Sequence, residues 1–191
     1  RTAKPARCFL GIQPGHRHFR DLKESSQIHA VSGVLIYRFS SNLFFANIQV
    51  LRQDIEDHIT PETKAVILDA SGIGSIDITA ADGLDILCKS LQKQNIRFYM
   101  TEHIAGLNEQ LRRLGLGYLI EEGHVRRTIH IALKDMGIGR PYPLEGGVDN
   151  TERSASRKRA DNRVQEFVWA FGQDAEDMIE KQIEKQIEQL K

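Results

Sequence analysis

The feature that most limits the possible folds is a short, continuously apolar run, Ala65–Leu68, with polar residues on both sides. Such a run is typical of a strand that is buried on both faces of a sheet. A glycine- and serine-rich loop follows over residues 69–77, and a helix closed by Asn95 comes next. The apolar face of that helix is predicted from the spacing of Leu84, Leu87, Cys88 and Leu91. With a further strand over Ile96–Met100, this order predicts a parallel βαβ unit in an α/β protein.

The N-terminal half supplies more elements of the same kind. A short strand is expected over Phe9–Ile12 and a clearer one over Val34–Phe39. The apolar piece Leu43–Phe45 is interpreted as core, so that Phe44 and Phe45 are expected to be buried. A helix then starts at Ala46 and ends before Pro61, with apolar positions at Ile48, Leu51, Ile55 and Ile59.

Two more helices are predicted beyond residue 100. The first has apolar positions at Ile104, Leu107, Leu111 and Leu114 and ends at Gly115. The second is marked by Val125, Ile129, Ala132, Leu133 and Met136 and ends at Gly137. The compact unit is therefore expected to end near Gly139, and a proline- and glycine-containing linker over residues 140–151 follows.

Residues 152–191 are heavily charged, and Ala175, Ile179, Ile183 and Ile187 recur every fourth position. This pattern predicts an amphipathic helical extension that lies on the domain or on a partner helix, and it suggests a homodimer through this helix. A largely solvated tail is the alternative. The basic cluster Arg157–Arg159 is interpreted either as a contact for anionic lipid head groups or as a solvated face.

Composition narrows the function classes. The chain has 191 residues, with 26 Lys+Arg against 26 Asp+Glu, and this balance argues against a nucleic-acid binder. Two cysteines are too few for a disulfide scaffold or a four-thiolate zinc site. No apolar run is long enough to span a bilayer. Because the sequence starts at Arg1, we interpret it as a piece of a longer protein.

The loop before the second predicted helix holds the candidate regulatory residues Asp69, Ser75, Asp77 and Thr79. Thr79-Ala-Ala-Asp82 matches a helix start, where a phosphate on the threonine would be favoured by the backbone N–H groups. The simpler interpretation is that Thr79 only caps the helix. Asp69 and Asp77 either pair as carboxylates or, more simply, make hydrogen bonds within turns.

No catalytic or cofactor motif is present. The sequence lacks a Walker loop, a complete dinucleotide fingerprint and a nucleophile elbow. His16 and His18 have no acidic or thiolate neighbours that would complete a metal site, and Cys88 is expected to be a core thiol. We therefore expect neither an enzyme nor a bound metal or cofactor.

Two segments resemble a known family. The stretch from Gly33 to Asn47, with Leu43-Phe44-Phe45-Ala46-Asn47, resembles the opening of the STAS domain at the C-terminus of SulP-family anion transporters. The stretch from Ala65 to Leu84 resembles the strand–loop–helix signature of the same domain. The name stands for sulfate transporter and anti-sigma factor antagonist.

The resemblance implies a four- to five-stranded mixed sheet with about four helices packed mainly on one face. It divides the chain into a connecting segment with the first strand (1–32), a STAS core (33–139), the linker and the extension. It also implies a non-catalytic, regulatory domain of a sulfate or related anion transporter, at the cytoplasmic face of the inner membrane. The transported anion is not readable from this sequence.

Possible partners follow from the same resemblance. They are the transmembrane domain of the same transporter, an acyl carrier protein or a regulatory kinase. The alternative function is a soluble anti-sigma factor antagonist that is phosphorylated at the loop–helix junction, at the position of Thr79. Nucleotide binding, suggested for some family members, stays open.

Overall fold

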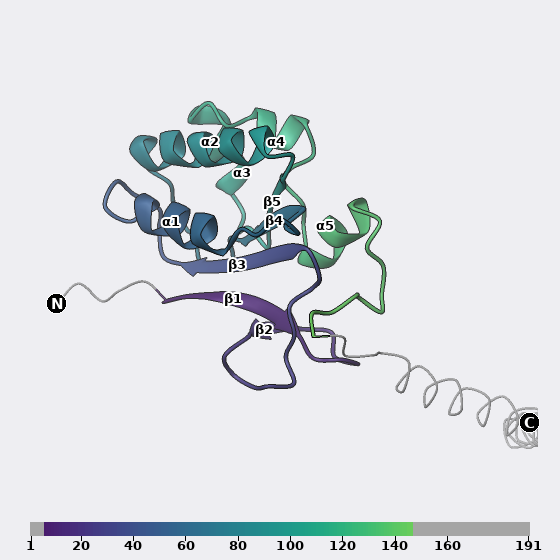
Figure 1. The fold of residues 1–191 in the computed structure, drawn as a ribbon. Coiled ribbons are helices and arrows are strands. Elements are labelled where there is room, and N and C mark those ends of the chain that lie inside the picture. Colours follow the sequence, from purple (N-terminus) through teal and green to yellow (C-terminus); the bar gives the residue numbers. More distant parts are fainter. Residues whose placement is uncertain (1–5, 147–191) are drawn as a thin grey trace, which may run out of the picture. The chain divides into compact units, whose positions relative to one another are not determined.

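The apolar run forms the central strand of the sheet in this computed structural model. β4 (Ala65–Asp69) is buried at all five positions. It pairs in parallel with β3 (Val34–Ser40) on one side and with β5 (Arg97–Thr101) on the other. The predicted parallel βαβ arrangement is confirmed, because one helix connects β3 to β4 and another connects β4 to β5 (Figure 1).

The N-terminal strands make the sheet mixed. β1 (Ala6–Ile12) runs antiparallel to β3 and also to β2 (Phe19–Asp21), giving the order β2-β1-β3-β4-β5. The five-stranded mixed sheet agrees with the expected STAS fold. β2 was not predicted, because this edge strand has only three residues and none of them is fully buried.

Four of the five helices within residues 6–146 cover one face of the sheet. They are α1 (Ile48–His58), α2 (Ile78–Lys93), α3 (Leu107–Arg113) and α4 (Tyr118–Glu121). Their apolar residues form one core cluster with Tyr37, Val66 and Leu68 of the sheet. α5 (Ile129–Asp135) packs on the opposite face, in a second cluster with Ile36, Ile67 and Tyr99 (Figure 1).

The final helix starts later than predicted, so the prediction was wrong at the N-terminal end of this helix. Val125 is not helical and forms an isolated parallel bridge with Met100. The backbone of Met100 bonds to His124 and Arg126, so this segment extends the sheet edge before α5 begins. Thr128 caps α5, and its side chain accepts the N–H of Ile131 at 3.2 Å. The apolar residues that predicted one helix thus belong to two elements, an extended segment at Val125 and the short helix α5.

The structure describes residues 6–146. The amphipathic repeat and the basic cluster of residues 152–191, and the dimer proposed from them, lie outside these residues. Of the segment assigned to the linker, Tyr142 and Leu144 are buried in the cluster that contains α5. No helix among residues 6–146 has the length and apolarity needed to cross a membrane.

Candidate interaction surface at the start of helix α2

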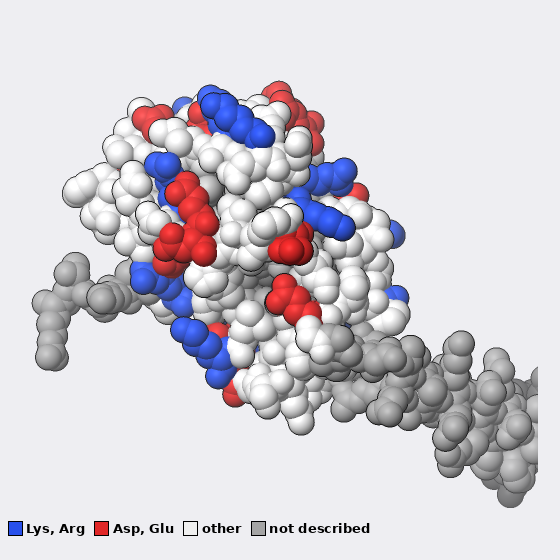
Figure 2. Space-filling model, in the orientation of Figure 1, with Lys and Arg blue, Asp and Glu red and all other residues white. Residues whose placement is uncertain are grey.

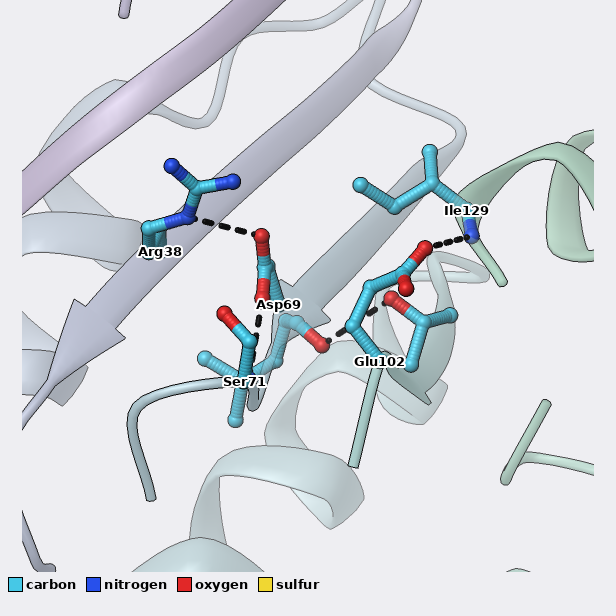
Figure 3. A network of polar contacts seen from close by, with 7 residues as sticks. Arg38, Asp69, Ser71, Glu102 and Ile129 are labelled. Atoms are coloured by element: carbon cyan, nitrogen blue, oxygen red, sulfur yellow. Dashed lines mark hydrogen bonds and ion pairs between the residues drawn. The ribbon is translucent and has the colours of Figure 1, made fainter. Parts of the chain in front are cut away.

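The β4–α2 loop starts at a buried carboxylate. Asp69, the last residue of β4, is 1% exposed and accepts a hydrogen bond from Arg38 Nε at 2.8 Å (Figure 3). Its other oxygen accepts the backbone N–H of Ser71 at 2.9 Å. Asp69 therefore makes the turn bond that the sequence predicted, and it does not pair with Asp77. Its position at the end of a parallel strand lets it fix the direction in which the loop leaves the sheet.

Two side chains from other segments hold the loop itself. Asn42 Oδ1 accepts the backbone N–H groups of Gly74 and Ser75, each at 3.0 Å. Gln110 of α3 accepts the N–H of Ile76 at 3.1 Å and donates to the carbonyl of Gly74 at 3.2 Å. The loop is thus hydrogen-bonded from both sides, and these bonds constrain its conformation.

Close packing explains one of the loop glycines. A Cβ atom on Gly72 would lie 2.5 Å from the Cα atom of Ser40, at the end of β3. Only a residue without a side chain permits this approach of two backbones. Gly72 is therefore required by the close packing of the loop against the end of β3.

Asp77, not Thr79, caps α2. The Asp77 carboxylate accepts the N–H of Ala80 at 2.7 Å, whereas Thr79 lies inside the first turn with an exposed side chain. The predicted capping role of Thr79 was therefore wrong. Asp77 lies two residues earlier, at the N-cap position. From there its carboxylate reaches the backbone N–H of Ala80, so the helix start already has a cap. Ser75 is also exposed, and its N–H is bonded to Asn42.

The predicted burial of Phe44 and Phe45 was wrong too. Their exposed fractions are 39% and 69%, and that of Ile78 is 69%, whereas Leu43 is 1% exposed. We call Phe44, Phe45 and Ile78 the apolar patch. Leu43 alone enters the core, where it forms a parallel bridge with Ile76, and the chain then turns outward into α1. A run of three apolar residues gives no indication of which member faces inward.

The patch is tied to the loop. Asp77 also accepts the backbone N–H of Phe45 at 3.1 Å, and Ile78 is the next residue after Asp77. The two phenylalanine rings lie edge to face, 5.8 Å apart. Aromatic side chains held on a rigid backbone are typical anchors of protein interfaces.

Sequence reasoning missed the residues that position this surface. Arg38, Asn42 and Gln110 are polar residues in a strand, a turn and a helix, and none of them was singled out as a candidate site residue. Their partners lie 31 to 36 positions away in the chain. Only the tertiary structure brings them to the loop, although a lone arginine in an otherwise apolar strand is a weak sign of a buried carboxylate partner.

The other singled-out residues stand apart from this surface. Cys88 is buried in the core, as predicted, and burial raises the pKa of its thiol to about 12. Among residues 6–146, no group of three His, Cys, Asp or Glu side chains is placed to hold a metal ion. On the face seen in Figure 2, basic and acidic side chains are intermixed.

Comparisons with known proteins place this fold and loop in a family. The model of the STAS domain matches residues 25–132. A probable sulfate transporter of Mycobacterium tuberculosis, Rv1739c, is 31% identical over 137 residues, which are 70% of this chain and 24% of that protein. The probable sulfate transporter 3.5 of Arabidopsis thaliana is 30% identical over 124 residues, 63% of this chain and 19% of the relative. The alignment thus spans about a quarter or less of these relatives.

Two solved structures share the fold. One is the murine Slc26a9 anion transporter, with a TM-score of 0.61 and 20% identity over 71% of this chain and 23% of that one. The other is a sulfate transporter family protein from Wolinella succinogenes, with a TM-score of 0.52 and 24% identity over 62% of this chain and 96% of that one. The class defined here is an α/β module with a mixed sheet and a structured β4–α2 loop. The chain belongs to the STAS domain family, and it is related to the STAS domains of SulP-family sulfate transporters.

Proposed function

We propose that this chain is the non-catalytic, regulatory domain of a SulP-type anion transporter. It would act at the cytoplasmic face of the membrane by contacting the transmembrane part of the same polypeptide. The relationship to sulfate transporters supports the transporter assignment. The apolar patch is the single observation that supports a docking function, because it exposes two phenylalanines on a backbone held by Asp77.

The physical argument rests on the cost of exposure. Each exposed phenylalanine leaves apolar surface in water, and burying that surface against a partner stabilises a complex by about 25 cal/mol per Å². The loop is already held by Asn42 and Gln110, so little ordering entropy opposes the association. A preorganised aromatic surface of this kind fits a protein partner better than a small polar ligand.

The transporter assignment is tested on the native protein. An antibody raised against this chain is used to probe fractionated source cells for the mass and location of the native polypeptide. We expect a band far larger than the 191-residue chain, in the membrane fraction. A band at the mass of the chain itself, outside the membrane fraction, would overturn the proposal.

The docking surface is tested by site-specific crosslinking within that native polypeptide. A photoreactive amino acid at position 45 is expected to crosslink to peptides of the membrane portion, as mapped by mass spectrometry. The matched control is position 131, where an isoleucine is 40% exposed on α5. Equal crosslinking from positions 45 and 131 would exclude the apolar patch as the specific contact.

The anti-sigma factor antagonist remains the second candidate, and the exposure of Thr79 favours it. The hydroxyl of Thr79 is open to a kinase because Asp77 carries the capping bond. Mass spectrometry of the native protein under several growth conditions tests this function. Phosphate on Thr79 supports it, and its absence under all conditions counts against it.

A further inference from the structure

A second, more polar site lies on the face of the sheet that α5 covers. It is a cavity of about 400 Å³, distinct from the apolar patch. Three arginines from distant parts of the sequence line it: Arg17 before β2, Arg38 in β3 and Arg140 after α5. Such a convergence of guanidinium groups is unfavourable unless negative charge balances it.

The carboxylates of the cavity are already engaged. Asp69 binds Arg38 and the N–H of Ser71. Glu102 accepts the backbone N–H of Ile129 at 3.0 Å (Figure 3). Arg38 has an ion-pair partner in Asp69. Among the described residues, no carboxylate lies within ion-pair distance of Arg17 or Arg140. Three arginines thus face two acids, and two of the three guanidinium groups have no carboxylate partner within residues 6–146.

Arg38 itself has donors left over. It binds Asp69 through Nε, and Figure 3 draws no hydrogen bond or ion pair from its two terminal nitrogens. The terminal N–H groups of an arginine form a planar fork that matches the spacing of oxygens in a carboxylate, sulfate or phosphate. The buried Asp69 therefore orients Arg38 and leaves its fork available.

His130 holds the rim of the cavity together. Its Nε2 donates to the backbone carbonyl of Arg17 at 2.8 Å, since a carbonyl only accepts. Its Nδ1 lies 2.5 Å from the hydroxyl of Tyr142. Arg140 Nη2 lies 2.8 Å and 3.0 Å from the two ring nitrogens. One imidazole thus contacts the backbone of Arg17 and the guanidinium group of Arg140, and it ties together the two segments that carry these residues.

We propose that this cavity binds a small oxyanion, such as sulfate, phosphate or a short dicarboxylate, through Arg17, Arg38 and Arg140. This inference does not depend on the proposed function, because binding is a property of the domain alone. A monatomic anion such as chloride cannot engage a guanidinium fork through two oxygens, so chloride is expected to compete weakly. A bound oxyanion would bridge the segment before β2, the end of β3 and the segment after α5.

The test is isothermal titration calorimetry on the full 191-residue chain. Sodium sulfate, sodium phosphate and sodium succinate are titrated separately, with sodium chloride at matched ionic strength as the reference. We expect saturable binding of at least one oxyanion beyond the chloride reference, and the three titrations identify which. If none of the three differs from chloride, the proposal is overturned.

Variants then locate the site. In the double variant Arg17→Ala with Arg140→Ala, both changed side chains are exposed, so the fold should persist, and we expect at least a tenfold loss of affinity. The matched control removes two exposed arginines of α3, Arg112→Ala with Arg113→Ala, and should bind as the unchanged chain does. Arg38→Lys keeps a cation beside Asp69 but removes the fork, and should also weaken binding. Equal affinity in all variants would place any binding elsewhere and refute the proposed site.

Discussion

Asp77 and Phe45 lie 32 positions apart in the sequence, and the Asp77 carboxylate accepts the Phe45 backbone N–H at 3.1 Å. The same carboxylate caps α2 through the N–H of Ala80. One side chain therefore fixes the start of a helix and the aromatic residue beside it. This relationship explains how an exposed phenylalanine acquires a defined position on the surface.

Replacing Asp77 by alanine should remove both bonds. Loss of the helix cap alone costs about 1 kcal/mol of unfolding free energy, and loss of the bond to Phe45 should add to it. Asp77→Asn keeps an acceptor oxygen and should be affected less. Urea unfolding measures the difference, with Asp82→Ala, an exposed change one turn further along α2, as the control. Equal unfolding free energies of Asp77→Ala and the control would contradict the two hydrogen bonds of Asp77.

Gly83→Ala should destabilise the protein although alanine favours helices. A Cβ atom on Gly83 would lie 2.5 Å from Cγ1 of Ile48, where α1 and α2 pack together. Overpacking costs about 1–3 kcal/mol, which exceeds the gain of up to about 1 kcal/mol from helix propensity. Thermal unfolding checks the sign, with Gln92→Ala on the exposed side of α2 as the control. In an Ile48→Ala background the effect should shrink, and an unchanged effect there would rule out the clash.

The Arg38–Asp69 ion pair should show strong coupling in a double-mutant cycle. Asp69 is buried and the Arg38 side chain is 36% exposed, so Arg38→Ala leaves a buried carboxylate without its cation. We expect a loss of about 3 kcal/mol, the lower end for a broken buried pair, because water reaches Arg38. The double variant with Asp69→Ala should lose about 1–2 kcal/mol less than the sum of the single variants. Additive losses in urea unfolding would show that the pair contributes nothing as a pair.

His130 should make the fold less stable in mild acid. Burial, as the largest cause, lowers the pKa of His130, and Arg140 and His18 act in the same direction. The bond to the Arg17 carbonyl and the nearby Glu102 act in the opposite direction, and Tyr142 contacts the ring. The unfolded chain therefore binds the proton more readily. The stability that neutral His130 contributes is fully present when the pH is above the ordinary histidine pKa of about 6.5. It is lost as the pH falls through the lowered pKa of His130 in the folded protein.

The measurement compares urea unfolding at several pH values for the unchanged chain and for His130→Gln. The variant should lose part of the pH dependence between neutral and mildly acidic conditions. Parallel stability curves for the two proteins would show that His130 does not contribute to it.

The two thiols should react in a fixed order. Cys88 is 8% exposed and burial raises its pKa to about 12, so little thiolate is present at pH 8. Burial also raises the pKa of Cys8, but that residue is only partly buried. A disulfide reagent should therefore modify Cys8 first and Cys88 only when urea unfolds the chain. The Cys8→Ser variant isolates the slow thiol, and rapid modification of that variant without urea would be evidence against a core position.

The sequence by itself determined the parallel core of this protein. Ala65–Leu68 had to be a strand with both faces covered, because four consecutive apolar residues leave no side for water. The helical spacing through Leu91 likewise determined α2, and the stretch from Ala65 to Leu84 indicated the STAS family. These features are local, since each depends on the order of neighbouring residues.

The tertiary structure decided which surface residues form a site. It turned Phe44 and Phe45 outward, moved the cap from Thr79 to Asp77, and brought Arg17, Arg38 and Arg140 around one cavity. A polar or aromatic residue at the end of a strand has no local pattern that specifies its partner. Its environment is set by segments tens of positions away, and only the packing of the sheet against its helices brings those segments together.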